Sequence, residues 1–402
     1  MRRFNVAGLC VPSYDYMVDI SGKLEQISAL VSEGKYFVIN RARQYGKTTI
    51  LAALERKLAD DYVVSFISFE GLGEESFKTS QKFCRSFINL IWQSLEFSDL
   101  PDEYKNGWLD NDVTNFDELG NRIKKMCKDK KVLLLIDEVD KTSNNKIFLQ
   151  FLSMLRAKYL ASKNGKDYTF HSVILAGVYD IRNIKLKIIN EGGYSPLETE
   201  GKIYNSPWNI AVKFDVDMSF SPAEISSMLA DYEADHSFGF DVSAIAEKIY
   251  EYTSGYPFLV SRICQCIDEE LDKNWTESGV TEAVKIIVNE DNVLFDDLSK
   301  NLENYPELFD FLYSVLIVGE EMSYNIGNPV VRLADMFGYI KRGESRGKAA
   351  ISNRIFEIYM SDYFISKDET KPLLMRKNAG VLHQDIVKGG VFDMELCLRK
   401  FA

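Results

Sequence analysis

Histidines, paired cysteines and long apolar runs are scarce in this chain. It contains three histidines among 402 residues, and its six cysteines form no CxxC pair. Structural zinc sites are built from such clusters, so the sequence predicts no zinc site. Scattered free thiols in a chain of this size are typical of a reducing compartment. The cysteines are Cys10, Cys84, Cys127, Cys264, Cys266 and Cys397.

Apolar segments and positive charge are also limited. No stretch approaches the roughly 18 apolar residues that span a bilayer, so we expect no membrane-spanning helix. Polar and aromatic residues follow Arg2 and Arg3, which argues against a secretory signal. The formal net charge of −12 disfavours nonspecific capture of nucleic acid, although it leaves a local basic surface open. We therefore predict a cytoplasmic protein of two or three globular domains.

A phosphate-binding loop is predicted between the apolar run 36–39 and a helical pattern that begins at Ile50. This strand, loop and helix context is what such a loop requires. Gly46 lets the backbone approach a polyphosphate, whose charge the loop amides and Lys47 would stabilise. Thr48 would offer its hydroxyl to Mg²⁺, which prefers oxygen ligands. A chance Gly-Lys-Thr sequence at a helix start is the alternative interpretation.

The predicted loop departs from its motif at one position. Arg41 stands where the pattern GxxxxGK[ST] has its first glycine. Glycine adopts a left-handed turn at little cost and arginine does not. The sequence therefore puts the tight turn at the loop entrance in question.

Two carboxylates, Asp137 and Glu138, end a continuous apolar run that begins at residue 132. Such a run is typical of a buried parallel strand whose carboxyl end opens onto a site. We predict that Asp137 holds Mg²⁺, directly or through water, and that Glu138 orients and deprotonates the water attacking the γ-phosphate. The alternative is a pair of helix-start carboxylates without a catalytic part. Nearby Asp140 has no predicted role.

Strands alternate with helices through the predicted core, which implies an α/β fold with a parallel sheet. Just past one strand, Asp180 and Arg182 would sense the γ-phosphate or reach a neighbouring subunit, unless they are simply solvated. The N-terminal arm would either wrap the adenine face or cover a sheet edge. Further strands are predicted over residues 62–69, 171–177 and 209–216, completing a five-stranded core, with helices over 76–97 and 116–128.

Downstream of the core the pattern becomes helical. Ser221 and Glu224 have capping-box spacing, with proline at the first helical position. Apolar spacing and a glycine-bounded hairpin over residues 338–351 outline a winged helix. Its turn carries Lys341, Arg342, Arg346 and Lys348, which either follow a nucleic-acid backbone or are solvated. The predicted domains are an arm (1–34), a core (35–216), a helical lid (217–303), a winged helix (304–365) and a C-terminal extension or start of a missing domain (366–402).

Together, these motifs resemble bacterial AAA-like P-loop ATPases related to the signal-transduction ATPases with numerous domains. The resemblance rests on residues 43–49, Asp137-Glu138, the Gly255-Tyr256-Pro257 turn and the trailing winged helix, and it covers roughly residues 14–365. It implies that Gly255 and Pro257 form a Gly-x-Pro lid motif, with the proline beside the nucleotide base. Residues 205–210 are similar to a subgroup that often continues into a PD-(D/E)XK nuclease-like domain, whose carboxylate and lysine constellation is not evident in residues 366–402.

The sequence and the resemblance predict a slowly ATP-hydrolysing, Mg²⁺-dependent switch that binds ATP and ADP. A homo-oligomer or a partner protein would supply an arginine, and nucleic acid would bind through the basic wing. A nucleotide-locked scaffold or DNA-binding regulator without significant turnover is the alternative. Glu138 and Lys47 are the predicted catalytic residues, and Thr48 and Asp137 the predicted metal ligands. Nucleotide-binding residues are predicted to be Arg43, Gln44, Tyr45, Gly46, Lys47, Thr48, Thr49, Asp137, Asp180, Arg182, Gly255 and Pro257.

Overall fold

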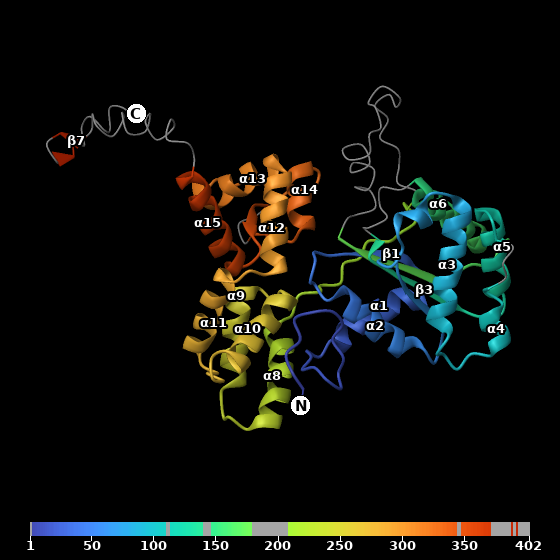
Figure 1. Ribbon diagram of the computed structural model, residues 1–402, viewed down its shortest axis with the longest axis horizontal. Coiled ribbons are helices and arrows are strands. Elements are labelled where there is room, and N and C mark those ends of the chain that lie inside the picture. The colour runs from blue at the N-terminus through green and yellow to red at the C-terminus, as the bar shows by residue number, and fades with distance from the viewer. Residues whose placement is uncertain are drawn as a thin grey trace.

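The computed structural model describes residues 2–109, 113–139, 146–178, 208–343 and 347–370, together with the short strands β7 (Val387–Lys388) and β8 (Val391–Phe392). Figure 1 shows two lobes side by side. An α/β lobe contains residues 21–178, a helical lobe begins at residue 222, and the N-terminal arm before residue 21 runs between them. Within the described ranges, no helix combines the length and apolar character needed to cross a membrane.

The α/β lobe is built on a four-stranded parallel sheet of order β1-β4-β3-β2. The two central strands, β3 and β4, are buried along their whole length because their apolar runs have a packed layer on each face. The predicted α/β fold with a parallel sheet is confirmed. The strands are β1 (Tyr36–Asn40), β2 (Val63–Ser68), β3 (Val132–Asp137) and β4 (Ser172–Gly177).

Helices cover both faces of this sheet, because successive residues of each strand point to opposite sides. Leu133 and Leu135 of β3 belong to the hydrophobic core that includes α1 and α2. Leu134 and Ile136 belong to the core on the other face, with α3, α5 and α6. The helices of this lobe are α1 (Ser21–Ser32), α2 (Lys47–Leu58), η1 (Glu74–Phe77), α3 (Ser80–Leu95), α4 (Asp102–Asn106), α5 (Phe116–Met126) and α6 (Lys146–Lys163).

The predicted fifth strand over residues 209–216 is wrong. In the described chain this segment makes one parallel bridge to β1, where the Val212 amide donates to the carbonyl of Tyr36 at 2.8 Å. Beyond that point side chains hold it in place, since Phe214 stacks on Phe37 with ring centroids 5.7 Å apart. Burial alternates from Lys213 to Val216 as it would in a strand, but the backbone there forms no ladder of hydrogen bonds with β1.

The helical lobe begins as predicted, since Ser221 and Glu224 form a capping box at the start of α8. Its first helices are α8 (Pro222–His236), α9 (Val242–Thr253), α10 (Pro257–Glu269), α11 (Glu277–Asn289) and α12 (Val293–Asn304). They are followed by α13 (Pro306–Tyr313), a π-helical turn η3 (Ser314–Val318), α14 (Pro329–Met336), the hairpin strands β5 (Ile340–Arg342) and β6 (Ala349–Ile351), and α15 (Arg354–Glu369).

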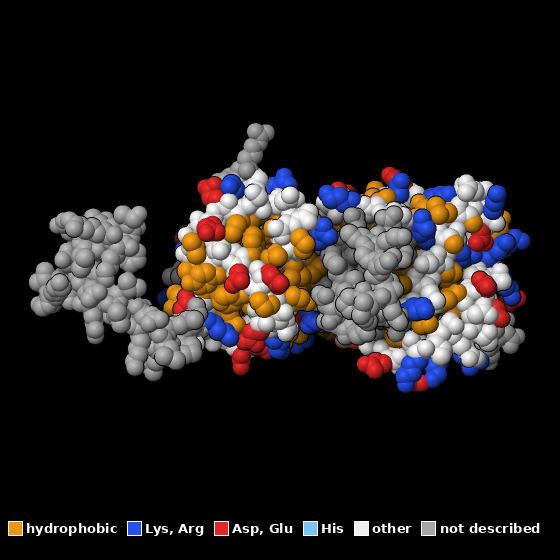
Figure 2. Space-filling view, turned by 90° about the horizontal axis from the view of Figure 1, so that it is seen from above, with side chains coloured by type: hydrophobic (Ala, Val, Ile, Leu, Met, Phe, Trp, Pro, Cys, Tyr) orange, Lys and Arg blue, Asp and Glu red, His pale blue; other side chains and the backbone are white. Residues whose placement is uncertain are grey.

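One hydrophobic core runs through the whole helical lobe. It contains residues of α8 to α12 and of α13 to α15, so the predicted boundary between lid and winged helix does not separate two cores and stays a prediction. The arm joins the same core through Phe4 and Tyr16. Figure 2 shows hydrophobic side chains gathered on the surface of this lobe, and its exposed apolar residues include Ile317, Val318 and Ile326. The described part of the chain therefore leaves some of this surface uncovered.

Candidate nucleotide-binding site

The loop between β1 and α2 has the backbone shape of an anion cradle. Gly46 caps α2 with φ 73°, in the left-handed region that favours glycine. Gln44 also has a positive φ, 56°, which is uncommon for a residue with a side chain and typical of functional loops. The amides at the start of α2 and the positive end of that helix therefore meet at the loop.

Lys47 is the first residue of α2, and its ammonium lies over the loop itself. It donates to the carbonyl oxygens of Arg41 and Ala42 at 3.1 and 3.0 Å. The residue is 8% exposed, so the charge is held at one place in a poorly hydrated environment. A fixed, partly desolvated cation beside a row of amides is suited to a phosphate.

Arg41 does not disturb the loop. Its backbone lies outside the left-handed region, so this position does not require glycine. Its guanidinium turns away from the cradle, donates to the carbonyl of Val216 at 2.9 Å and lies over the ring of Phe214. Arg41, at the first position of the motif, therefore packs against the 208–220 segment.

The strand tip and the loop helix meet through Thr48 and Asp137. The Thr48 hydroxyl donates to Asp137 Oδ2 at 2.6 Å, and the Glu138 amide donates to Asp137 Oδ1 at 2.9 Å. Asp137 is 2% exposed. Two hard oxygen donors thus converge beside the cradle, a donor set that fits Mg²⁺.

Glu138 follows Asp137 with φ 55°, a conformation that costs a residue with a side chain about 1–2 kcal/mol. The turn places Glu138 on the wall of the site while Asp137 stays beneath it. The two neighbouring carboxylates therefore occupy different environments, and their different tasks stay a prediction.

A cleft of about 1120 Å³ opens above this constellation. The α/β lobe contributes the loop and Glu138, and the helical lobe contributes the start of α10 and the connection between α11 and α12. Residues 5–10 of the arm line a further part of the wall. Of the predicted site residues, those that line the cleft are Arg43, Gln44, Tyr45, Gly46, Lys47, Thr48, Thr49, Glu138 and Pro257.

The N-terminal arm contacts both the sheet and the cleft. Helix α1 packs against the sheet through Ile27 and Val31, as a covering helix would. The preceding residues reach the cleft, where the Cys10 amide donates to Thr49 Oγ1 at 3.3 Å. Thr49 therefore binds the arm through its hydroxyl. A contact of the arm with adenine stays a prediction.

The helical lobe touches the loop directly. The Tyr256 hydroxyl donates to the Arg43 carbonyl at 2.6 Å, and its ring meets the edge of Tyr45 at 4.7 Å. Burial raises the pKa of Tyr45 to about 12 and also raises that of Tyr256 well above its ordinary value, so both phenols stay neutral. Asp297 of α12 forms an ion pair with Arg43 at 3.2 Å. The position of Tyr256 inside the Gly-x-Pro motif was a signal for its role, whereas nothing in the sequence marks Asp297.

Gly255 allows two backbone segments to pack closely and is not part of the cleft wall. Its φ is 73°, and a Cβ at this position would lie 2.0 Å from the carbonyl oxygen of Phe220. The Phe220 amide donates to the Gly255 carbonyl at 2.8 Å, so two backbones lie in direct contact. Pro257 lines the cleft two residues later.

We expect Gly255→Ala to lower the free energy of unfolding by about 2–5 kcal/mol, because it adds overpacking to left-handed strain. Gly239→Ala is the matched control, since Gly239 has a similar φ of 76° and nothing within 4 Å of its built Cβ. The control should lose only the stability that left-handed strain costs, about 1–2 kcal/mol of unfolding free energy. Urea unfolding followed by circular dichroism measures both, and equal losses would contradict the close approach at Phe220.

Three of the remaining predicted residues are not described by the structure. Asp180 and Arg182 fall outside the described residues, as does Arg346 of the basic turn. The other basic side chains of the hairpin contact their own lobe. Lys341 donates to Ser254 Oγ at 3.0 Å, and Lys348 forms an ion pair with Glu321 at 3.4 Å. Glu321 therefore offsets the charge of Lys348, whereas the hydrogen bond to the neutral Ser254 hydroxyl leaves the charge of Lys341 unchanged.

The sequence matches the family described as an AAA-like domain over residues 12–362. A Walker-type ATPase of Pyrococcus abyssi is similar in structure, with a TM-score of 0.59 at 11% identity over 89% of this chain and 99% of that chain. No curated protein matches the sequence.

Two further solved structures are matched over similar lengths. The ORC2 protein of Aeropyrum pernix has a TM-score of 0.44 at 12% identity, over 92% of this chain and 98% of that chain. Cdc6p of Pyrobaculum aerophilum has a TM-score of 0.38 at 14% identity, over 92% and 98%. At 11% identity, the similarity to the Pyrococcus abyssi protein concerns the fold alone.

Proposed function

Because this chain belongs to the AAA-like domain family, we propose that it is an Mg²⁺-dependent ATPase that acts as a slow molecular switch. The observation that carries the proposal is the hydrogen bond of Thr48 to Asp137 at 2.6 Å, at the base of a cleft that Lys47 and Glu138 also line. The cleft volume of about 1120 Å³ is slightly above the range of about 300–1,000 Å³ found for small-molecule sites.

Each residue of the site has a task in this proposal. Lys47 and the loop amides would bind the β- and γ-phosphates, and Thr48 and Asp137 would hold Mg²⁺. Bound Mg²⁺ would neutralise charge that develops on the phosphates during the transfer. Glu138, on the cleft wall, would orient the attacking water and accept its proton.

Turnover by the chain alone is expected to be slow. Two described arginines line the cleft, and carboxylates hold both of them: Arg43 pairs with Asp297, and Arg262 pairs with Glu290 at 2.6 Å. An arginine from a neighbouring subunit or a partner protein is worth about 10³-fold or more in related phosphoryl-transfer enzymes. We therefore propose that such an arginine completes the site.

The helical lobe is the moving part of the proposed switch, in the manner of the signal-transduction ATPases with numerous domains. Its contacts on the loop, Tyr256 on Arg43 and Gly338 beside Ala42, give it a direct connection to the nucleotide. Exchange of ADP for ATP would change those contacts and so the position of the lobe. The assignment of α8 to α12 as a lid and of residues 304–365 as a winged helix is part of this proposal.

The same contacts favour a second candidate, a scaffold locked by bound nucleotide. An ion pair between Arg43 and Asp297 and a hydrogen bond from Tyr256 hold the loop, which would slow nucleotide exchange. Bound ADP that copurifies without turnover would support this candidate. DNA binding through the wing has no comparable support, since Lys341 and Lys348 contact their own lobe.

Alkylation of Cys10 tests whether nucleotide binds in this cleft. Cys10 lines the cleft and is partly exposed, whereas the other described cysteines are buried. Cys397 lies outside the described residues, so the experiment uses the Cys397→Ser background. At an ADP concentration about 100 times Kd, about 1% of the sites are free, and labelling of Cys10 should slow by at least about tenfold. Burial raises the pKa of the Cys10 thiol, so labelling needs mildly alkaline solution.

Peptide mapping by mass spectrometry after timed maleimide treatment gives the labelling rate, and phosphate release from ATP gives turnover. Protection together with Mg²⁺-dependent phosphate release supports the switch. Protection without release supports the locked scaffold. Equal labelling with and without ADP would contradict nucleotide binding in this cleft.

A further inference from the structure

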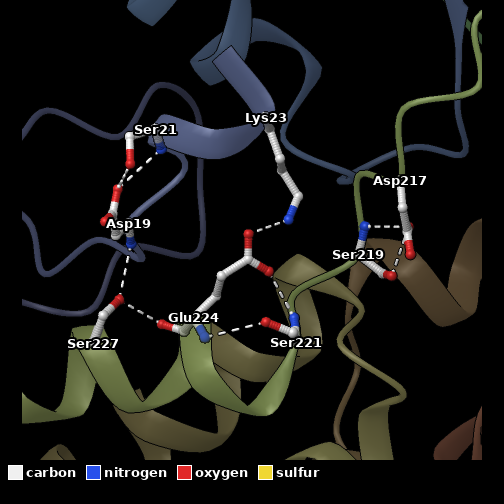
Figure 3. Close-up of polar contacts among 8 residues, drawn as sticks. All are labelled: Asp19, Ser21, Lys23, Asp217, Ser219, Ser221, Glu224 and Ser227. Carbon is white, nitrogen blue, oxygen red and sulfur yellow. Dashed lines mark hydrogen bonds and ion pairs between the residues drawn. The ribbon is translucent and has the colours of Figure 1, made fainter. Parts of the chain in front are cut away.

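A partly buried ion pair joins the two lobes. The Lys23 ammonium of α1 contacts Glu224 Oε1 of α8. The Lys23 side chain is 9% exposed and the Glu224 side chain 20%, so the ammonium is buried and the carboxylate partly buried. Figure 3 shows Lys23 reaching from the helix of the α/β lobe toward the first turn of α8. Each charge therefore depends on the other for its stabilisation.

Glu224 has a second task at the same place. Its other oxygen, Oε2, accepts from the Ser221 amide at 2.7 Å and closes the capping box of α8. Nearby, the Asp19 amide donates to Ser227 Oγ at 2.9 Å, which ties the start of α1 to α8 a second time (Figure 3). The first turns of the two helices are thus held together by a charge pair and a hydrogen bond.

Both helices lead to the nucleotide cleft. On one side α1 packs against α2 in a shared core, and α2 begins at Lys47. On the other side, the residue before the α8 cap, Phe220, lies against the backbone of Gly255. Tyr256 and Pro257 follow and line the cleft. A shift of the α8 terminus relative to α1 would therefore move Pro257 relative to the phosphate-binding loop.

We propose that the Lys23–Glu224 pair is a positioning element that holds the helical lobe closed over bound nucleotide and so sets the rate of nucleotide release. This inference rests on the proposed function. Removing one partner leaves the other charge buried and unpaired, which favours an open junction where water can reach it. Removing both charges removes the cost of an unpaired charge, so the junction between the two lobes should close again in the double variant.

Three variants separate this role from ordinary stabilisation. Lys23→Met strands the carboxylate, and Glu224→Gln strands the ammonium while its amide oxygen still closes the capping box. The double variant carries neither charge. Glu25→Gln, on the exposed side of α1, is the matched control for loss of a carboxylate. Stopped-flow release of a fluorescent ADP analogue and single-turnover hydrolysis of bound ATP are measured for each.

We expect each single variant to release the analogue about tenfold faster, as when the closed state falls to about a tenth of the population. The double variant should return to within about threefold of the parent, and the single-turnover rate should stay within about twofold throughout. Unchanged release in the single variants would overturn the proposal. Release from the double variant as fast as from the single variants would overturn it equally.

Hydrogen exchange without nucleotide separates this proposal from the proposed function. If the parent binds no ADP analogue, the proposed function fails, yet amide exchange over residues 218–226 still reports whether the pair holds α8. Faster exchange in both single variants, restored in the double variant, would uphold the junction. Equal exchange in all three variants would refute it.

Discussion

Lys47→Ala is expected to weaken ATP and ADP binding by at least about thirtyfold and to abolish measurable turnover. The buried ammonium is the cation held over the loop, and truncating one partner of a desolvated charge pair costs about 2–5 kcal/mol. At 1.4 kcal/mol per factor of ten, this corresponds to about thirtyfold to several thousandfold in affinity. Isothermal titration calorimetry with ADP and Mg²⁺ measures the change.

Lys57→Ala is the matched control for this prediction. Lys57 lies on the same helix, in its last turn and exposed, so the variant removes a lysine without touching the cradle. It should bind nucleotide as the parent does. Affinity that falls equally in both variants would show that loss of charge or of helix stability, rather than the position of Lys47, is responsible.

Glu138→Gln is expected to lower kcat by about 10²–10⁴-fold while nucleotide affinity stays within about threefold of the parent. Glutamine keeps the size and hydrogen-bonding capacity of the side chain but cannot accept the proton of the attacking water, and general-base catalysis is worth about this factor. Phosphate release under saturating ATP gives kcat, and titration with ADP gives the affinity.

Asp129→Asn provides the comparison for this variant. Asp129 is exposed in the turn before β3, at the opposite end of the strand from Glu138. Its variant should hydrolyse ATP normally. Turnover in Glu138→Gln equal to that of the parent would remove Glu138 from its proposed role, even if the cleft binds nucleotide.

The parts of the site that could be predicted are those whose sequence pattern and chemistry coincide. An apolar run followed by Asp137 predicts a buried strand with a metal-ligating carboxylate at its end. The Gly46-Lys47-Thr48 segment predicts the start of a helix. The structure brings these segments together through the Thr48 hydroxyl. Local rules sufficed because each segment forms its own element, and parallel strands open at one edge of the sheet.

What could not be predicted depends on contacts between distant segments. The 209–216 segment has the alternation of a strand, but the bridge at Val212 is its one ladder contact with β1 in the described chain. Asp297 lies on a helix of ordinary composition, and its ion pair with Arg43 follows only from how the lobes pack. Lys23 likewise reads as an exposed position of an amphipathic helix until α8 is placed against it.

The route of the arm has a consequence for how this protein folds. Phe4 and Tyr16 belong to the core of the helical lobe, and Arg2 forms hydrogen bonds with Asp235, 233 positions away along the chain. Contacts between such distant positions close late, because a long chain must first be ordered between them. During synthesis, the N-terminal residues can therefore form these contacts only after most of the helical lobe has been made. We expect slow refolding and a single melting transition shared by both lobes.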